Sequence, residues 1–248
     1  PVSSSDFNKY FDCIYIINLP DERNKIKNLT ELLKNDNVHY KIIDGIYVKN
    51  NTKYSKYYLR WIYQQNLDEK LLNKYVFDEN IYLKNNQDLK DLYTTKIELW
   101  NHYIKYGKEE DRLLYKKTNI KLLSELGNLI AHINVLKDAI KNEYSKILIL
   151  EDDVYIHNNY KELHKNLVDT LQNFNLLYYG CIQKKWEGIN LEKNNYKTNN
   201  SYGAFAYAVK KQMFNILIEK YEDLVNPTDK CLIEISKKND CYVSYPNI

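Results

Sequence analysis

The sequence predicts an α/β fold, and three observations lead to that prediction. The chain opens with an apolar strand, a helix and a second strand, the order that is typical of a parallel sheet covered by helices. A long helix and another short apolar strand, residues 146–150, restore the alternation later. Between the opening unit and this long helix, residues 47–119 have helical periods and no strong strand. We therefore expect one α/β domain, residues 1–46 and 120–248, with a helical insertion at residues 47–119.

The opening strand-helix-strand unit follows from its residue types. Apolar and β-branched residues at 13–19 predict a buried strand. Pro20 and the two acids after it favour the first turn of a helix, which we expect to end near Lys34. Residues 38–43 predict a second strand, which ends at the turn Asp44-Gly45.

The remaining segments are assigned by period, length and turn residues. Residues 1–10 are polar and predict a loose arm, and the Asn-rich residues 183–200 predict a flexible loop. Predicted helices lie at residues 121–143, 160–174, 211–221 and from 226 onwards, and further predicted strands at residues 176–179, 201–209 and 241–245.

Three acids, Glu151, Asp152 and Asp153, stand at the carboxyl end of the strand 146–150, where open α/β sheets bind their ligands. Because adjacent carboxylates repel one another, they favour a cation among them. Side chains alternate along a strand, so we expect Glu151 and Asp153 to face one way and Asp152 the other. Oxygen ligands suit Mg²⁺ or Mn²⁺, ions that are usually shared with substrate phosphates. The alternative is a solvated acidic turn that caps the next helix.

The bulk composition disfavours several classes of protein. A net charge of +3 is too small to indicate a nucleic-acid partner. We find no apolar run long enough to cross a bilayer and no visible secretory signal. The expected location is the cytoplasm. The chain begins at Pro1 rather than at a methionine, which predicts a domain of something longer. Its four cysteines lack metal-site spacing and predict reduced, buried thiols, although a Cys231–Cys241 bridge stays open.

Residues at other strand ends are candidates for binding a ligand. Asn18 and Arg23 flank the first strand-to-helix turn, where a guanidinium can bind a diphosphate through two hydrogen bonds. Asp44 beside Gly45 suits ribose or base contacts, although Asp-Gly is also a common turn. Gly203 lies in a strand of small residues, which lets a ligand approach the backbone. The chain has no GxGxxG or GxxxxGK[ST] motif, which disfavours dehydrogenases and P-loop enzymes.

Two further residues have both a structural and a functional interpretation. His132 lies near the apolar stripe of the helix 121–143, which favours a core histidine over a catalytic one. Asp229 follows Pro227 and Thr228 at the start of a helix, so capping is its default explanation. Across a cleft from the three acids, the same carboxylate can instead deprotonate a sugar hydroxyl.

Taken in order, these segments resemble glycosyltransferase family 25, the group of lipopolysaccharide and collagen β-galactosyltransferases. The resemblance covers nearly the whole chain apart from residues 47–119. It implies a GT-A (Rossmann-like) fold, a nucleotide-sugar donor that is usually a UDP-hexose, a divalent metal and inversion at the anomeric carbon. The matching segments are Ile16-Ile17-Asn18-Leu19 with Arg23, Ile43-Asp44-Gly45, Gly127 with His132, Leu148–Val154, Gly203–Val209, and Pro227 with Asp229 and Leu232.

The resemblance also implies a role for each matching residue. His132 would face the donor cleft and act in catalysis together with Asp152, and Asp229 would be the base. The sequence departs from the family before the histidine, at Asn128, Leu129 and Ala131, where a Cys-Ala-x-Ser-like pattern is common. Implied ligands of Mn²⁺ or Mg²⁺ and the donor phosphates are Glu151, Asp152 and Asp153. Implied contacts of the nucleotide sugar are Asn18, Leu19, Arg23, Asp44, Gly45 and Gly203.

The insertion resembles small helical modules that accompany glycosyltransferases of bacteria and giant viruses. That resemblance is carried by Tyr82–Leu89, Trp100–Tyr103, Gly107 and Arg112. With a bias toward Asn, Lys, Ile and 25 tyrosines, it predicts a giant-virus origin, and hence the host cytoplasm or the virion as location. We expect Trp100, Tyr103 and Tyr106 to form the core of this module rather than a sugar-stacking surface.

The sequence therefore predicts a metal-dependent inverting glycosyltransferase that moves galactose or glucose from a UDP-sugar to a hydroxyl of a glycan or protein. A nucleotide sugar and that acceptor are the predicted partners. A second class is a catalytically inactive glycan- or protein-binding module on the same fold. A third is a nucleotidyltransferase, but such an enzyme is expected to have a Gly-rich basic phosphate loop, which Leu19-Pro20-Asp21-Glu22 does not resemble.

Overall fold

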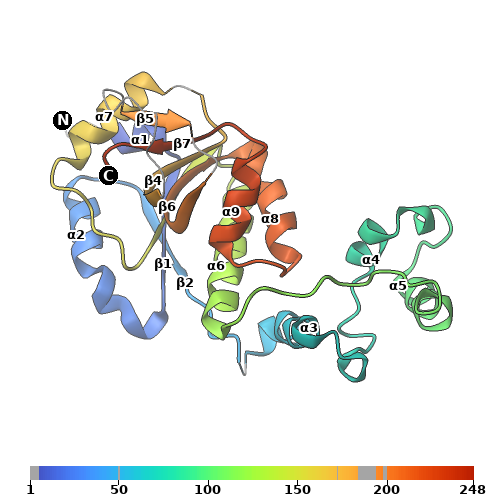
Figure 1. Ribbon diagram of the computed structural model, residues 1–248. Helices are drawn as coiled ribbons and strands as arrows, with labels where there is room; N and C mark the ends of the chain where they lie inside the picture. Colours follow the sequence, from blue (N-terminus) through green and yellow to red (C-terminus); the bar gives the residue numbers. More distant parts are fainter. Residues whose placement is uncertain (1–5, 50, 172, 184–193, 198–199) are drawn as a thin grey trace. The chain divides into compact units, whose positions relative to one another are not determined.

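The computed structural model describes residues 6–49, 51–171, 173–183, 194–197 and 200–248 (Figure 1). The chain divides into two compact units, each with its own internal contacts. The first unit comprises Pro1–Ile46, Gly127–Glu222 and Pro227–Ile248, and the second comprises Tyr47–Leu126 and Asp223–Asn226.

In the described residues, the first unit is built on a seven-stranded sheet with the order β2-β1-β3-β6-β4-β7-β5 (Figure 1). β1 pairs in parallel with β2 and with β3, and β4 pairs in parallel with β7. The pairs β3–β6, β4–β6 and β5–β7 are antiparallel, so the sheet is mixed. The strands are β1 Cys13–Asn18, β2 Tyr40–Asp44, β3 Lys146–Glu151, β4 Leu176–Gln183, β5 Asn195–Lys197, β6 Ser201–Lys210 and β7 Cys241–Ser244.

Helices cover both faces of this sheet, which confirms the predicted α/β class (Figure 1). On one face, Leu33 of α2 and Leu167 of α7 pack into the same core as Leu148 of β3. On the other face, Tyr207 of β6 contacts α6 and α8, and α9 packs on β6. The helices are α1 Asp6–Tyr10, α2 Lys27–Asn35, α6 Leu123–Lys141, α7 Tyr160–Thr170, α8 Phe214–Glu222 and α9 Thr228–Ser236.

The central strands are apolar runs because both of their faces are covered. All six residues of β1 are buried, and so are Ile147–Leu150 of β3. The polar residues Asn18 and Glu151 come last in these two strands, which run in the same direction. The carboxyl ends of β1, β2 and β3 therefore meet at one edge of the sheet, where the sequence places its candidate residues.

Some element boundaries differ from the prediction. Residues 20–26 form a 3₁₀ helix, η1, with a kink at Glu22 (φ −114°), and α2 begins only after it. Of the loose arm predicted for residues 1–10, residues 1–5 lie outside the described residues, and residues 6–10 form α1 because Phe7 is buried in the core next to α7. The predicted loop at residues 183–200 contains β5, which pairs with β7, whereas 184–193 and 198–199 lie outside the described residues.

All described elements of the second unit are helical. Its core contains Phe77, Tyr82 and Tyr103, and Trp100 packs against it while partly buried. Tyr106 is 40% exposed, so the prediction that it belongs to this core is wrong. Its elements are η2 Thr52–Tyr54, α3 Ser55–Asn66, η3 Glu69–Leu71, α4 Glu79–Asn85, η4 Gln87–Leu89, α5 Lys96–His102 and the π-helix η5 Tyr103–Gly107.

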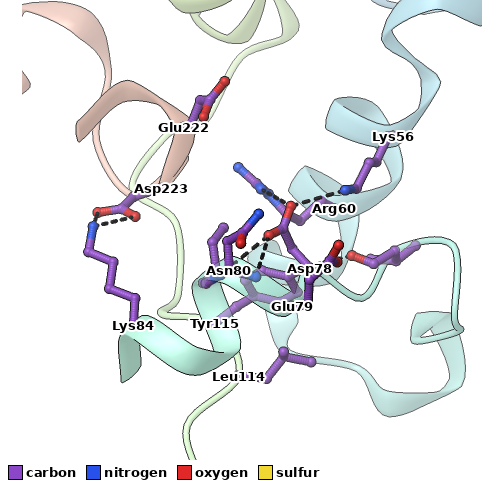
Figure 2. A network of polar contacts seen from close by, with 12 residues as sticks. Lys56, Arg60, Asp78, Glu79, Asn80, Lys84, Leu114, Tyr115, Glu222 and Asp223 are labelled. Carbon is purple, nitrogen blue, oxygen red and sulfur yellow. Dashed lines mark hydrogen bonds and ion pairs between the residues drawn. The ribbon is translucent and has the colours of Figure 1, made fainter. Parts of the chain in front are cut away.

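Asp78 is the centre of a polar network in the second unit (Figure 2). Its carboxylate accepts hydrogen bonds from Lys56 Nζ at 3.0 Å and from the backbone N–H groups of Asn80 and Ile81 at 3.2 and 3.3 Å. Nη1 of the buried Arg60 lies 3.9 Å from the same carboxylate. Asp78 therefore caps α4 and has two cations beside it.

Two further sequence expectations concern the whole chain. All four cysteines are buried and none is in a disulfide, so the Cys231–Cys241 bridge does not form. In the part of the chain that the structure describes, no helix combines the length and the apolar character needed to cross a membrane.

Candidate functional site

The three acids at the end of β3 do not form one cluster. β3 ends at Glu151, and Asp152 and Asp153 form the turn that follows. Glu151 points toward α6 on one face of the sheet, where it is hydrogen-bonded. Asp153 lines cavities on the opposite face, together with Leu148 and Leu150. The expectation that Glu151 and Asp153 face the same way is therefore wrong, because side-chain alternation stops where the strand gives way to a turn.

Asp152 belongs to a network that joins four of the predicted residues. The buried Asn18 donates from Nδ2 to Asp152 Oδ2 at 2.8 Å. Arg23 Nη1 donates to Asn18 Oδ1 at 2.8 Å and to the Asn18 carbonyl at 3.0 Å. Its Nη2 forms an ion pair with Asp44. The carboxyl ends of β1, β2 and β3 are thus connected through Asn18 and Arg23, as the sequence order predicts.

The other predicted contacts of the nucleotide sugar shape the backbone. The Gly45 N–H donates to the Asn18 carbonyl at 2.9 Å, and a Cβ on Gly45 would lie 3.0 Å from Leu19 Cδ2. This close approach explains the glycine after Asp44. Gly203 has φ +102°, and a Cβ there would lie 2.4 Å from the ring of Phe205. The ring thus gives Gly203 a local packing role.

Asp153 lies where negative charge gathers. Burial and then the charges of Glu151 and Asp152 raise its pKa above the ordinary value, and Lys25 opposes that shift. Lys25, Asp152 and Asp153 line a cavity of about 570 Å³ beside α2. A second cavity of about 590 Å³ has Asp153 and mainly apolar walls such as Leu32. Asp153 is therefore open to ligands from two directions. A cation bound beside it would favour its ionised form.

His132 is fully buried, which confirms the core histidine that the apolar stripe of its helix favours. The cleft-facing position that the family resemblance implies is wrong. Its Nε2 lies 3.1 Å from Glu151 Oε1, and its Nδ1 lies 2.9 Å from the hydroxyl of Tyr207. Because an ionised carboxylate only accepts, Nε2 is the donor to Glu151. The Tyr207 hydroxyl is in turn 3.4 Å from that of Tyr221. Among the described residues, the hydrogen bond to Glu151 is the contact that connects His132 to the end of β3.

Glu151 is held by one of its two oxygens. Asn128 Nδ2 donates to the same Oε1 at 2.8 Å, so this atom accepts two hydrogen bonds from α6. Burial alone would raise the pKa of Glu151, but the bonds from His132 and Asn128 and the charge interaction with His132 outweigh burial and lower it. Glu151 is therefore a fixed, ionised side chain whose Oε1 is occupied by hydrogen bonds from α6.

Asp229 is the second residue of α9 and is partly buried. The N-cap of this helix is Pro227, with no side-chain hydrogen bond, so Asp229 is not the cap that the sequence suggests by default. Its neighbour Thr228 donates from Oγ1 to Asn128 Oδ1 at 2.7 Å. The start of α9 is thereby connected to Glu151 and the end of β3.

Sequence reasoning missed three residues of this arrangement: Asn128, Thr228 and Tyr207. Asn128 and His132 are spaced i, i+4 on a helix, and such residues lie on one face. The sequence did contain a signal for Asn128. It is a polar residue four positions before a histidine, and that histidine lies at the edge of an apolar stripe. Thr228 and Tyr207 carry no comparable pattern, because their partners are distant in the sequence.

Among the described residues, no group of three or more His, Cys, Asp or Glu side chains is arranged to hold a metal ion. Asp152 and Asp153 are two adjacent carboxylates, and two carboxylates suit an ion that takes its other ligands from a diphosphate and water. The pKa of Asp153 is raised, so its ionised form is disfavoured in the free protein and would be stabilised by a bound cation. These two residues therefore fit Mg²⁺ or Mn²⁺ only together with a phosphorylated ligand.

Comparison with known families gives one match that covers most of the chain. The family described as Glycosyltransferase family 25 (LPS biosynthesis protein) matches residues 11–232. The matched range includes the end of β3, the Asn18–Arg23–Asp44 network and the start of α9. No curated protein matches the chain.

Proposed function

The chain belongs to glycosyltransferase family 25, and on that premise we propose that it moves a hexose, galactose or glucose, from a UDP-sugar to a hydroxyl of a glycan or protein. The mixed α/β sheet is consistent with the GT-A-like fold of such transferases. The observation that carries the proposal is the network of Asp152, Asn18, Arg23 and Asp44. It lies at the carboxyl ends of three neighbouring parallel strands, where α/β folds bind nucleotides.

Arg23 and Asp44 are suited to the nucleotide part of the donor. Their side chains are 38% and 63% exposed, so both can reach a ligand without rearrangement of the core. A guanidinium binds phosphate oxygens through two parallel hydrogen bonds, and a carboxylate accepts from the hydroxyls of a ribose. Arg23 is already held by its hydrogen bonds to Asn18. Its guanidinium therefore loses less conformational entropy when a ligand binds.

Asp152 and Asp153 are the residues that would hold Mn²⁺ or Mg²⁺ together with the donor diphosphate. Such an ion, when bound, neutralises the negative charge that develops on the leaving UDP. Asn18 fixes the orientation of Asp152, while Asp153 remains open to the cavity beside Lys25. Lys25 adds a positive charge on the same side.

Asp229 is our proposed base. Its carboxylate takes the proton of the acceptor hydroxyl, and the oxygen of that hydroxyl forms a bond to the anomeric carbon. The bond from this carbon to the UDP oxygen breaks, and UDP leaves with the electron pair. Attack from the face opposite to UDP inverts the configuration of the sugar.

A screen of UDP-sugars with Mn²⁺, scored by UDP release, tests this function. We expect turnover with a hexose donor and loss of turnover in EDTA and in Asp152→Asn. Asp240→Asn is a matched control, because Asp240 is an exposed acid that pairs with Lys197 outside the site. If Asp152→Asn in the presence of EDTA turns over donor as fast as wild type does with Mn²⁺, the metal-dependent mechanism is excluded.

The same screen separates the transferase from an inactive binding module. The inactive module would bind a glycan or protein but release no UDP from any donor. The open Asp153 and the exposed Arg23–Asp44 pair favour the active enzyme, because a module without donor chemistry has no need for these charged groups at one edge.

A further inference from the structure

Asn128 connects the two places that the proposed reaction needs. It lies on α6, and its side chain uses both ends of its amide group: Nδ2 donates to Glu151 Oε1 at 2.8 Å, and Oδ1 accepts from Thr228 Oγ1 at 2.7 Å. The carboxylate can only accept, so the amide nitrogen must face Glu151 and the oxygen must face Thr228. The orientation of Asn128 is thus determined by its partners.

The contact on the Thr228 side does not serve the helix. Thr228 is the first residue of α9 and is 3% exposed, yet the helix has no side-chain cap. The N-cap position, whose side chain commonly accepts from a free backbone N–H of the first turn, is occupied here by Pro227. Thr228, one position later, donates its hydroxyl proton to Asn128. The contact therefore fixes the start of α9, including Asp229, relative to α6.

The contact on the Glu151 side is reinforced by a second donor. His132 follows Asn128 by four residues on α6 and donates to the same Glu151 oxygen. Tyr207 holds the other nitrogen of this histidine. Glu151 directly precedes Asp152, so the end of β3 is fixed to α6 at the point where the acidic turn begins. Asn128 is the member of this set that reaches α9 as well.

We propose that Asn128 is a positioning residue that sets the place of Asp229 relative to the acids after β3. The inference rests on the proposed function, in which Asp229 takes the acceptor proton while Asp152 and Asp153 face the donor diphosphate. The acceptor oxygen must approach the anomeric carbon in line with the departing UDP. An error of about 1 Å in such an arrangement costs on the order of 100-fold in rate. A hydrogen-bonded bridge between β3 and α9 limits that error.

Thr228→Val is the most direct variant, because valine has nearly the shape of threonine but no hydroxyl to donate. We expect its kcat for transfer to fall on the order of 10- to 100-fold. The affinity for UDP with Mn²⁺ and the KM for the donor should change less than about twofold, since Asp152, Asp153 and Arg23 are untouched. Thr228→Ser keeps the hydroxyl and should retain kcat. Asn128→Asp, which puts a carboxylate against Glu151, should lower kcat in the same way.

Ser236→Ala is the matched control for loss of a buried hydroxyl from α9. Ser236 lies at the other end of the helix, where its Oγ donates to the Ile233 carbonyl at 2.9 Å. We expect it to match Thr228→Val in melting temperature while keeping the wild-type kcat. If Thr228→Val keeps kcat within twofold, or if UDP affinity and melting temperature fall in step with kcat, the positioning role is refuted.

Asp229→Asn separates this inference from the proposed function. We expect its kcat to fall at least as far as that of Thr228→Val, with UDP affinity unchanged. Wild-type kcat in Asp229→Asn would refute the proposed base, whatever the result for Thr228→Val. A full loss in Asp229→Asn with no loss in Thr228→Val or Asn128→Asp would refute the positioning role alone.

Discussion

Asp78 and Asp153 lie in different units, and their carboxylates meet opposite surroundings. Asp78 accepts hydrogen bonds from Lys56 and from two backbone N–H groups and lies near Arg60 (Figure 2). Burial alone would raise the pKa of Asp78, but these partners outweigh burial and lower it. For Asp153, burial and the charges of Glu151 and Asp152 act together and raise the pKa. Asp78 is half-buried and compensated by these partners, whereas the exposed Asp153 lies beside two other acids whose charges outweigh the effect of Lys25.

This difference is the reason why we interpret Asp78 as a structural acid and propose Asp153 as a functional one. An acid that caps a helix and pairs with cations stabilises its unit in the absence of any ligand. An acid placed beside other acids lowers the stability of the free protein, and perturbed groups of this kind gather at functional sites. The contrast predicts opposite effects when each acid is replaced by its amide.

Asp153→Asn is expected to have the largest effect on activity. If Asp153 faces the donor diphosphate as proposed, its loss should remove several kcal/mol of transition-state stabilisation, or roughly 1,000-fold in kcat/KM. The melting temperature in EDTA should rise, because the amide is not repelled by Glu151 and Asp152. UDP release and thermal melting measure the two effects. If Asp153→Asn is both less active and less stable than wild type, then Asp153 stabilises the free protein as Asp78 does, and the difference between the two acids is contradicted.

Asp78→Asn should have the reverse profile. The free energy of unfolding should fall by about 1.5–3 kcal/mol, the usual contribution of hydrogen bonds to charged groups, while kcat per folded molecule stays unchanged. Urea unfolding followed by tryptophan fluorescence is suitable, since Trp61 and Trp100 both belong to the second unit. A loss of kcat at unchanged stability would place Asp78 in the chemistry instead.

The stabilising effect of Asp78 should also depend on pH with a defined sign. Its pKa is lower in the folded protein than in the unfolded chain, so its contribution is complete above the unfolded value of about 3.9. The contribution is lost as the pH falls through the lower, folded pKa. The difference in unfolding free energy between wild type and Asp78→Asn should therefore shrink below about pH 4. A difference that persists undiminished in acid would show that packing, and not charge, is responsible.

Arg23→Lys should have a smaller effect, on binding. Lysine keeps the charge but cannot contact Asn18 and Asp44 at the same time with a planar fork. We expect UDP to bind roughly tenfold more weakly, which corresponds to about 1.4 kcal/mol, at an unchanged melting temperature. Calorimetry with UDP and Mn²⁺ measures this directly. Equal affinity would remove Arg23 from the donor site.

Tyr207→Phe should have the smallest effect. It removes the hydroxyl beside His132 Nδ1 and should cost about 1 kcal/mol of stability and only a severalfold decrease in kcat. Tyr178→Phe is the matched control, because the Tyr178 hydroxyl is buried without a hydrogen-bond partner. That variant should be neutral or more stable. Thermal melting of the two variants side by side provides the comparison.

The parts of the site that the sequence predicted are those with local patterns. The β-α-β order is contained within residues 13–44, and the short apolar strand before Glu151 and the Asp44-Gly45 turn each occupy a few consecutive residues. From parallel strand order alone, their carboxyl ends were expected at one edge of the sheet. The bond between Asn18 and Asp152, 134 residues apart, follows from that expectation.

The parts that the sequence did not predict depend on packing between distant elements. Asn128 and Thr228 are 100 residues apart in the sequence. Tyr207 of β6 and His132 of α6 are 75 residues apart, and they form a hydrogen bond between the sheet and the helix that covers it. The turn after Glu151 likewise depends on tertiary packing, so the expected direction of Glu151 was wrong. The apolar period of α6 did predict a buried His132, and only the cleft-facing position that the family resemblance implies was wrong.

The central claim is that the acids after β3, unlike Asp78, face a donor diphosphate and its metal ion. Calorimetric titration of UDP, with Mn²⁺ and with EDTA, tests it on wild type, Asp152→Asn and Asp78→Asn. We predict that UDP binds to wild type and Asp78→Asn only with Mn²⁺, and to Asp152→Asn in neither condition. Binding of equal strength in EDTA, or wild-type binding by Asp152→Asn, would contradict the account.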